Sequence, residues 1–240
     1  MNSSVQIIPL THLIMAFVPV LAVIGVIFAW SLNTKYTLYA VARMLGQLLL
    51  VGYFLTTIFE TDSAMLIIAI LVVMVFSSSW IALGTVKVQR KKLYTHAMCS
   101  IALGGGVTLL FVTQGVLQLS PWYSPQYIVP LAGMIFASSM NSVSLAAERL
   151  HAEMERGVVY QEAKKIALQA SLIPVVNSLL AVGLVSIPGM MTGQILSDVS
   201  PLIAARYQIM VMCMVFGAAG ISAASFLVLA GLVEDKNLSE

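Results

Sequence analysis

LIMAFVPVLAVIGVIFAW, Leu13 to Trp30, contains no charged residue. An α-helix of about 20 such residues, rising ~1.5 Å per residue, crosses the ~30 Å hydrocarbon core of a bilayer. Similar runs recur along the 240-residue chain, which is 60% hydrophobic and 9% charged. Its mean hydropathy is +0.97, and soluble domains carry about 25% charged residues. The sequence therefore predicts an all-α integral membrane protein.

Seven apolar runs predict a polytopic bundle of about seven transmembrane helices in a single domain, residues 1–240. Only one run holds a charged residue, Arg43. No Lys or Arg precedes the first run, so we do not expect a cleaved signal peptide. The expected spans are Leu13–Trp30, Leu38–Phe59, Ala64–Gly84, Ala97–Leu117, Tyr127–Ala147, Leu168–Ile187 and Tyr207–Val233.

The basic residues predict the orientation, because cytoplasmic loops carry an excess of Lys and Arg. With the N-terminus outside, the cytoplasmic loops and tail collect ten of the twelve basic residues. The outer loops hold only Arg206, together with three acidic residues, Glu60, Asp62 and Asp198. We therefore expect the N-terminus outside and the C-terminus in the cytoplasm. The ten residues are Lys35, Lys87, Arg90, Lys91, Lys92, Arg149, Arg156, Lys164, Lys165 and Lys236.

One long polar segment, AERLHAEMERGVVYQEAKK, runs from Ala147 to Lys165. Its charges alternate in sign, which is typical of a solvated helix rather than of a basic helix bound to lipid. Two interpretations remain open. The segment is either an extension of a helix into water or a docking element for a cytoplasmic partner.

Polar side chains at membrane depth usually face a bundle interior or a water-filled cavity. Arg43 and Gln47 are four residues apart on one helix face. Either both side chains line a translocation path, or the Arg43 side chain snorkels to the inner headgroups. Asn141 lies in a serine-rich stretch, FASSMNSVS. That stretch either hydrogen-bonds neighbouring helices or lines a translocation path.

The stretch IPGMMTGQI, Ile187 to Ile195, follows the sixth apolar run. We expect Pro188 to end or kink that span, because proline lacks an amide donor and clashes with the preceding turn. The segment is therefore predicted to be a broken or re-entrant element near the outer end, although a simple turn would also fit. Met190 and Met191 carry soft thioethers that suit Cu(I), but methionine is also a common filler of apolar gaps. The alternating Met210, Met212 and Met214 are interpreted as packing residues.

Several motifs are missing from the sequence. It contains no G-x-x-x-x-G-K-[ST], so we do not expect this chain to bind ATP through a P-loop. No acidic residue falls in the middle of an expected span, which argues against a proton-driven transporter. The three histidines, His12, His96 and His151, lie on different segments and form no evident metal site.

Four blocks together resemble the FetB family of ABC transporter permeases, which includes bacterial iron-export permeases and plant aluminium-sensitivity membrane proteins. The blocks are RMLGQLLLVGYFL, PLAGMIFASSMNSVSLAAERL, GLVSIPGMMTGQI and RYQIMVM. The resemblance extends from about Arg43 to Met214. It implies a permease subunit of the bacterial inner membrane that exports a metal ion, with iron favoured. The metal-binding residues are not identified.

The resemblance also implies how the transporter is assembled. Two permease copies would pair with two copies of a separate cytoplasmic P-loop ATPase, which would bind the ATP and Mg²⁺. This chain would bind no cofactor and no nucleic acid, and it would not itself be an enzyme. The segment here runs ERGVVYQEAKKIALQASLIP and lacks the Leu-Gly-Ala-Thr stretch usual in the family, so a shorter coupling element is expected.

These inferences assign two sets of residues. The translocation path or gate would contain Arg43, Gln47, Asn141, Pro188, Gly189, Met190, Met191, Thr192, Gly193, Gln194 and Gln208. The ATPase-coupling segment, about 147–165, would act through Glu148, Arg149, Glu153, Glu155, Arg156, Glu162, Lys164 and Lys165. Two alternatives remain, namely a stand-alone secondary transporter or channel and a membrane scaffold that transports nothing.

Overall fold

The structure is a computed structural model that describes residues 8–86 and 90–238. Within these ranges the chain is helical and forms no strand, which confirms the predicted all-α class. Contacts divide it into two compact units, Met1–Thr61 and Asp62–Glu240, and each unit is described by itself. Lys87 and the side chain of Lys236 lie outside the described part of the chain. The orientation in the membrane stays a prediction.

The first unit contains α1 (Leu10–Met15), α2 (Phe17–Ala29) and α3 (Thr34–Phe59). A break separates α1 from α2, and a tight turn joins α2 to α3. The break between α1 and α2 follows from Pro19, which has no N–H to donate to the carbonyl of Met15 and whose ring clashes with it. Ser31 has a positive φ of 56° in the turn. The Asn33 side chain then accepts a hydrogen bond from the Tyr36 N–H at 3.1 Å and caps α3.

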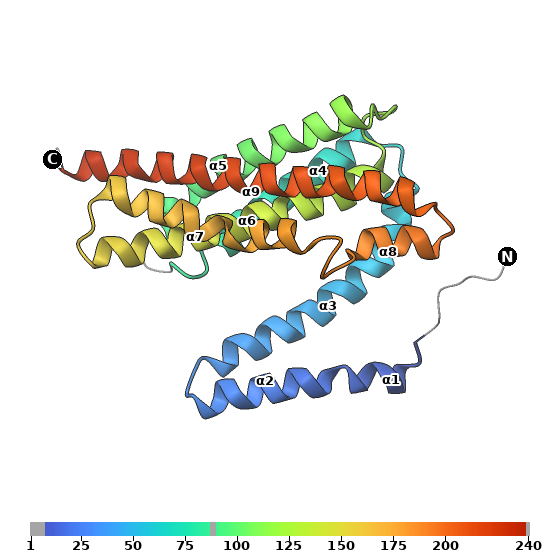
Figure 1. Cartoon of the computed structure of the whole chain (residues 1–240), viewed down its shortest axis with the longest axis horizontal. Helices are drawn as coiled ribbons and strands as arrows, with labels where there is room; N and C mark the ends of the chain where they lie inside the picture. Colours follow the sequence, from blue (N-terminus) through green and yellow to red (C-terminus); the bar gives the residue numbers. More distant parts are fainter. Residues whose placement is uncertain (1–7, 87–89, 239–240) are drawn as a thin grey trace. The chain divides into compact units, whose positions relative to one another are not determined.

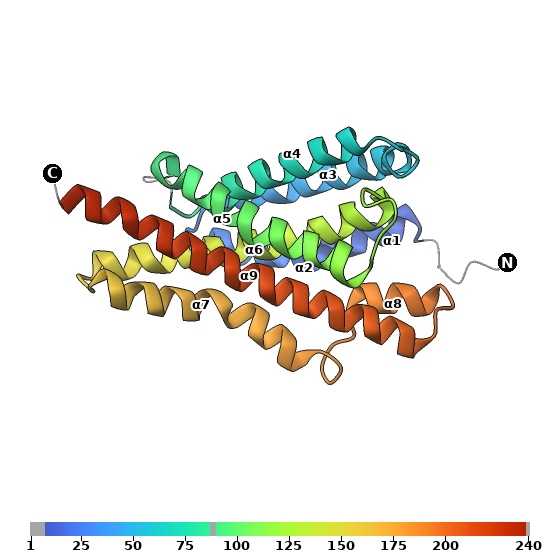
Figure 2. The ribbon, with the colours of Figure 1, turned by 90° about the horizontal axis from the view of Figure 1, so that it is seen from above.

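The second unit is a helical bundle with α6 at its centre. Its elements are α4 (Ala64–Ala82), α5 (Arg90–Leu110), the π-helix η1 (Phe111–Val116), α6 (Pro125–Glu155), α7 (Tyr160–Ala181), α8 (Gly189–Leu196) and α9 (Pro201–Leu238). Helix α6 contacts α4, α5, α7 and α9, and α9 also packs along α5 and α7 (Figures 1 and 2). Side chains on α6 and α9 therefore contribute to the core and line the spaces between the helices.

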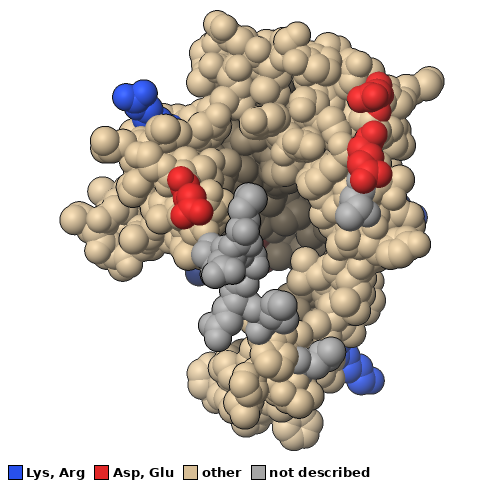
Figure 3. All heavy atoms as spheres, turned by 90° about the vertical axis from the view of Figure 1, so that its right-hand side faces the viewer, with Lys and Arg blue, Asp and Glu red and all other residues tan. Residues whose placement is uncertain are grey.

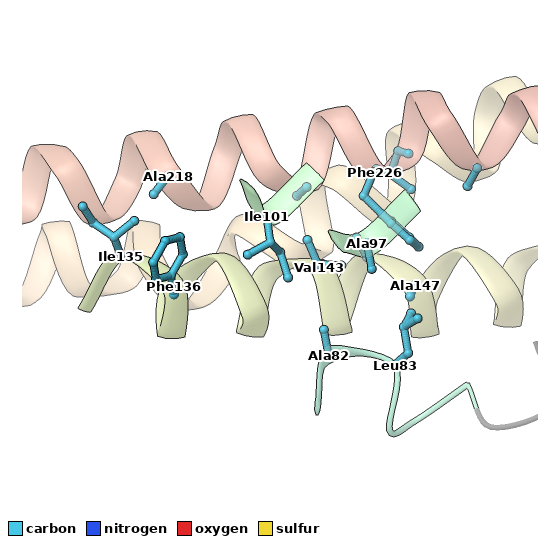
Figure 4. Packing of buried hydrophobic residues seen from close by; sticks show 14 of the residues in the cluster. Ala82, Leu83, Ala97, Ile101, Ile135, Phe136, Val143, Ala147, Ala218 and Phe226 are labelled. Carbon is cyan, nitrogen blue, oxygen red and sulfur yellow. The ribbon is translucent and has the colours of Figure 1, made fainter. Parts of the chain in front are cut away.

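The core of this unit depends on close approach of the helices. Figure 4 shows Ile135 and Phe136 of α6 beside residues of α5 and α9 in one apolar cluster. A Cβ added at Gly104 of α5 would lie 2.6 Å from the backbone nitrogen of Ser222 on α9. At Gly105 it would lie 2.7 Å from the Phe136 ring. Small residues let membrane helices approach this closely, so the glycines set the α5–α9 and α5–α6 spacing.

The described residues contain six helices that are long and apolar enough to cross a membrane, compared with the seven predicted spans. The predicted span without a counterpart among these six is Leu168–Ile187, most of which falls in the second part of α7. Helix α7 ends at Ala181, so its uncharged part is shorter than the ~20 residues of a full crossing. Even so, α7 runs beside α6 and α9 within the bundle (Figure 2). The six helices are Thr11–Ala29, Thr34–Leu55, Ala64–Ala82, Arg90–Val116, Pro125–Glu155 and Pro201–Gly231.

Candidate functional site in the membrane bundle

The break after the sixth predicted span begins earlier than Pro188. Helix α7 ends at Ala181, Val182 is extended and Gly183 has a φ of +83°. The Gly183 N–H donates to the carbonyl of Ser186 at 3.0 Å and closes a tight loop. Glycine adopts positive φ without steric cost. The prediction that Pro188 itself ends or kinks this span is therefore wrong, because the helix stops at the loop containing Gly183.

Pro188 instead begins α8. Its backbone, at φ −64° and ψ 147°, occupies the N-cap position, and its carbonyl accepts a hydrogen bond from the Thr192 N–H at 3.0 Å. Proline fits the start of a helix because the N–H that it lacks would have no helical acceptor there. With eight residues, α8 is only about 12 Å long and cannot span a bilayer. The stretch is thus a short separate helix, and its role as a gate stays a prediction.

A cavity of about 360 Å³ lies between α6, α8 and α9. We call it the methionine cavity because Met134, Met190 and Met210 line it, together with Gln194 and Tyr207. None of the described residues that line it is charged. The surrounding end of the molecule also shows few charged side chains (Figure 3). The Gln194 Oε1 atom is buried and has no hydrogen-bond partner among the described residues.

A second cavity, of about 330 Å³, lies farther along α6 and is lined by α6, α7 and α9. Met134 lines both cavities. Met134, Ser138, Asn141 and Leu145 recur at helical spacing, so one face of α6 lines the second cavity and reaches the first. Of the predicted path residues, Asn141 lies on this face. Its role in transport stays a prediction.

The serines of α6 also connect the helices. Ser138 Oγ donates to the carbonyl of Val215 at 3.2 Å, and Ser139 Oγ donates to that of Ala218 at 3.3 Å, both on α9. Ser142 Oγ donates to the carbonyl of Ser171 on α7 at 3.3 Å. The interpretation that this stretch hydrogen-bonds neighbouring helices is therefore confirmed for these three hydroxyls. Ser138 and Ser142 line the second cavity as well, so the two interpretations overlap.

The structure brings together only part of the predicted path. Met190 and Gln194 line the methionine cavity, whereas Gly189, Thr192 and Gly193 are exposed on α8 and Met191 is half-buried. Gln208 is buried in α9 and 5% exposed. Its Oε1 atom has no hydrogen-bond partner among the described residues, and it is not among the residues that line the methionine cavity. Arg43 and Gln47 lie on α3 of the first unit, and their part in a path remains a prediction.

The predicted coupling segment, residues 147–165, consists of two helix ends and a turn. Helix α6 continues to Glu155, α7 begins at Tyr160, and Gly157 in the turn has a φ of +80°. With 31 residues, α6 is about 46 Å long and therefore exceeds a ~30 Å hydrocarbon core. We call this element the α6–α7 hairpin. The chain reverses direction within this short turn, so no long loop separates the two helices.

The charged side chains of the hairpin differ in how far they are exposed. Glu153 is 5% exposed, and its Oε1 lies 2.6 Å from Arg149 Nη2 and 3.4 Å from Arg156 Nη1. This buried carboxylate is paired with two arginines at the end of α6, and its role in coupling stays a prediction. His151 pairs with Glu155 at 3.2 Å on the same helix. Lys164 is half-buried, and the exposed members of the predicted set are Glu148, Glu155, Arg156, Glu162 and Lys165.

The hairpin is also attached to α9. The Tyr160 hydroxyl donates a hydrogen bond to the Leu227 carbonyl, and a Cβ at Gly231 would lie 2.6 Å from the Tyr160 ring. Sequence reasoning missed this contact, as it missed Met134 and Met210 as cavity residues. Met210 had been interpreted as packing from its alternating pattern. Only the three-dimensional arrangement shows which side of α9 meets a cavity.

The six long apolar helices of the described residues define this molecule as a polytopic helical membrane protein. An uncharged cavity lies beside the short helix α8. The chain belongs to the uncharacterised protein family UPF0014, whose model matches residues 10–232. The predicted family resemblance is therefore confirmed.

Three relatives illustrate this similarity. A UPF0014 membrane protein of Synechocystis sp. is 35% identical over 197 residues, which cover 76% of each chain. The probable iron export permease protein FetB of Escherichia coli is 32% identical over 78% of this chain and 77% of its own. Protein ALUMINUM SENSITIVE 3 of Arabidopsis thaliana is 30% identical over 85% of this chain and 80% of its own. No solved structure matches the chain.

Proposed function

We propose that this chain is the permease subunit of an ABC transporter that exports a metal ion, with iron favoured. One observation carries the proposal. The chain is 32% identical to a protein named as a probable iron export permease, over 77% of that protein. The aligned part is long enough to include most of a membrane bundle, so a shared transport role is the simplest explanation of the similarity.

The energy for export would come from a separate chain. The sequence has no P-loop motif, so ATP and Mg²⁺ would bind to a cytoplasmic ATPase partner. Two permeases and two ATPases would form the transporter in the bacterial inner membrane. ATP binding and hydrolysis would then move the permeases between inward-open and outward-open states.

The α6–α7 hairpin is the proposed docking element for this partner. It extends beyond the length needed to cross the membrane and carries exposed charges of both signs, including Glu162 and Lys165. Its buried Glu153 pairs with two arginines at the end of α6. A rigid hairpin attached to α9 at Tyr160 would transmit movement of the ATPase to the membrane bundle.

Purification from the native membrane in mild detergent tests the proposal. We expect a P-loop ATPase to co-purify in equal amount, and the complex to export Fe²⁺ in proteoliposomes only when ATP is present. The charge reversal Lys165→Glu should lower the amount of ATPase recovered. Lys35→Glu, an exposed charge on α3, serves as the matched control and should not.

Two results would contradict the proposal. Transport by this chain in liposomes without ATPase would indicate a secondary transporter or a channel. If the purified protein transports nothing with or without ATP and every candidate metal, a scaffold role becomes the better interpretation.

A further inference from the structure

Three methionines from distant parts of the chain line one cavity. Met134 lies on α6, Met190 on α8 and Met210 on α9, and each lines the methionine cavity. The fold therefore gathers three thioethers around a space of about 360 Å³. Methionine has three rotatable bonds, so each sulfur can move toward a ligand held in this space.

The chemistry of the lining limits what could bind there. Thioethers are soft ligands that select Cu(I), whereas Mg²⁺, Ca²⁺ and Mn²⁺ prefer carboxylate, carbonyl and water oxygens. No charged residue is found among the described lining residues, so no carboxylate would neutralise a bound ion. The cost of moving an ion out of water is large and rises steeply with its charge. An uncharged cavity therefore favours a monovalent ion over a divalent or trivalent one.

The rest of the described chain offers no competing site of the usual kind. Among the side chains that the structure describes, no group of three or more His, Cys, Asp or Glu could hold a metal ion. Gln194 also lines the cavity, and its Oε1 atom is buried without a hydrogen-bond partner among the described residues.

We propose that the methionine cavity binds a soft monovalent cation of the Cu(I) or Ag(I) class through the sulfur atoms of Met134, Met190 and Met210. The proposal concerns a binding site and not the exported metal ion, which the proposed function takes to be iron. As a statement about binding, it concerns this chain alone and does not depend on the ATPase partner.

The experiment uses the full chain, purified in detergent, with Ag(I) as a redox-stable probe. The exposed thiols of Cys99 and Cys213 also bind Ag(I), so both are first replaced by alanine. Calorimetric titration should then show one saturable Ag(I) site per chain, and Cu(I) should compete for it in the presence of a chelator. X-ray absorption of the Cu(I) form should show sulfur as the neighbouring atom.

Leucine variants distinguish binding from packing, because leucine nearly conserves the volume of methionine and lacks the sulfur. We expect Met134→Leu, Met190→Leu and Met210→Leu each to weaken Ag(I) binding by about tenfold or more, and the triple variant to abolish it. Met140→Leu is the matched control on α6, because Met140 is not among the residues that line the cavity, and it should bind as the parent does. Circular dichroism and thermal unfolding should be unchanged in the single variants.

The inference is overturned if the parent shows no saturable site, or if the three single variants bind Ag(I) as tightly as Met140→Leu. Equal affinity for Fe²⁺ and Ag(I) would also overturn it. The outcome is separable from the proposed function. A parent with no saturable Ag(I) site but with ATP-dependent iron export would leave the permease function standing while removing the thioether site.

Discussion

The contact between α5 and α9 and the short helix α8 are opposite extremes of packing in the same unit. At Gly104, α5 approaches α9 so closely that an added Cβ would lie 2.6 Å from a backbone nitrogen. Helix α8 contains no fully buried residue, and added Cβ atoms at Gly189 and Gly193 would meet nothing within 4 Å. The first region fixes the spacing of the bundle, whereas the second is packed more loosely against it.

This difference indicates where stability and movement reside. Segments with few buried apolar contacts open at low free energy, and the elements that move in function come from this class. Both Met190 and Gln194 of α8 line the methionine cavity. A small displacement of α8 would therefore change the lining of the cavity while the α5–α9 contact stays intact. Substitutions in the two regions should separate loss of stability from loss of transport.

The largest effect is expected from Gly104→Ala. The new methyl group would meet the Ser222 backbone, which cannot rotate away as a side chain could. Overpacking of this kind costs about 1–3 kcal/mol and occasionally more, and we expect the upper end of this range. Unfolding in a denaturing detergent titration measures the change. Gly106→Ala on the same helix is the control, because its Cβ would meet nothing within 4 Å, and it should be neutral or slightly stabilising.

A smaller effect is expected from Glu153→Gln at the α6–α7 hairpin. The substitution leaves Arg149 and Arg156 without their shared carboxylate. Losing one partner of a fully buried ion pair costs about 3–5 kcal/mol. The Arg149 side chain is 40% exposed, and solvation of the arginines should reduce the cost to about 1–2 kcal/mol. Hydrogen exchange should show faster opening of the turn, whereas Glu148→Gln, an exposed neighbour, should leave it unchanged.

Helix class and most helix positions followed from local patterns in the sequence. The predicted spans Ala64–Gly84 and Ala97–Leu117 correspond to α4 and to α5 with η1, because apolar length is a property of the segment itself. The end of α7 was misplaced for a physical reason. Helix α7 passes through Pro174 and stops at Ala181, and Gly183 just beyond it takes a φ of +83°, which composition alone does not reveal.

The candidate site was predicted only in part. Met190 and Gln194 belong to an unusual block and could be selected from the sequence. Met134 and Met210 could not, because they are ordinary methionines in apolar helices until the fold brings them to one cavity. The contact of Gly104 with Ser222 was missed for the same reason, since it joins residues of α5 and α9.

A modest loss is expected from Ser139→Ala in the packed region. Its hydroxyl is fully buried and donates to the Ala218 carbonyl at 3.3 Å. Hydrogen bonds between membrane helices contribute about 0.6 kcal/mol on average, so the free energy of unfolding should fall by roughly that amount. Ser77→Ala, at an exposed position of α4, should change it less. A larger loss at Ser77 would contradict the assignment of the packed region.

A similarly small effect on stability is expected from Pro188→Ala, together with a clear loss of transport. Alanine can adopt the φ of −64° found at this N-cap, so the free energy of unfolding should change by less than about 1 kcal/mol. Proline also keeps the preceding residue, Ile187, out of the helical region. Without it, α8 can extend backward and rotate Met190 and Gln194 relative to the cavity.

Metal export per unit of protein in the membrane, compared with Pro201→Ala, measures this effect. Pro201 begins α9, so its replacement matches the loss of a proline at a helix start without altering α8. We expect export to fall several-fold in Pro188→Ala and to remain near the parent value in Pro201→Ala. If export and protein amount fall together in Pro188→Ala, the proline serves only to start a helix. The loose packing of α8 would then carry no functional meaning.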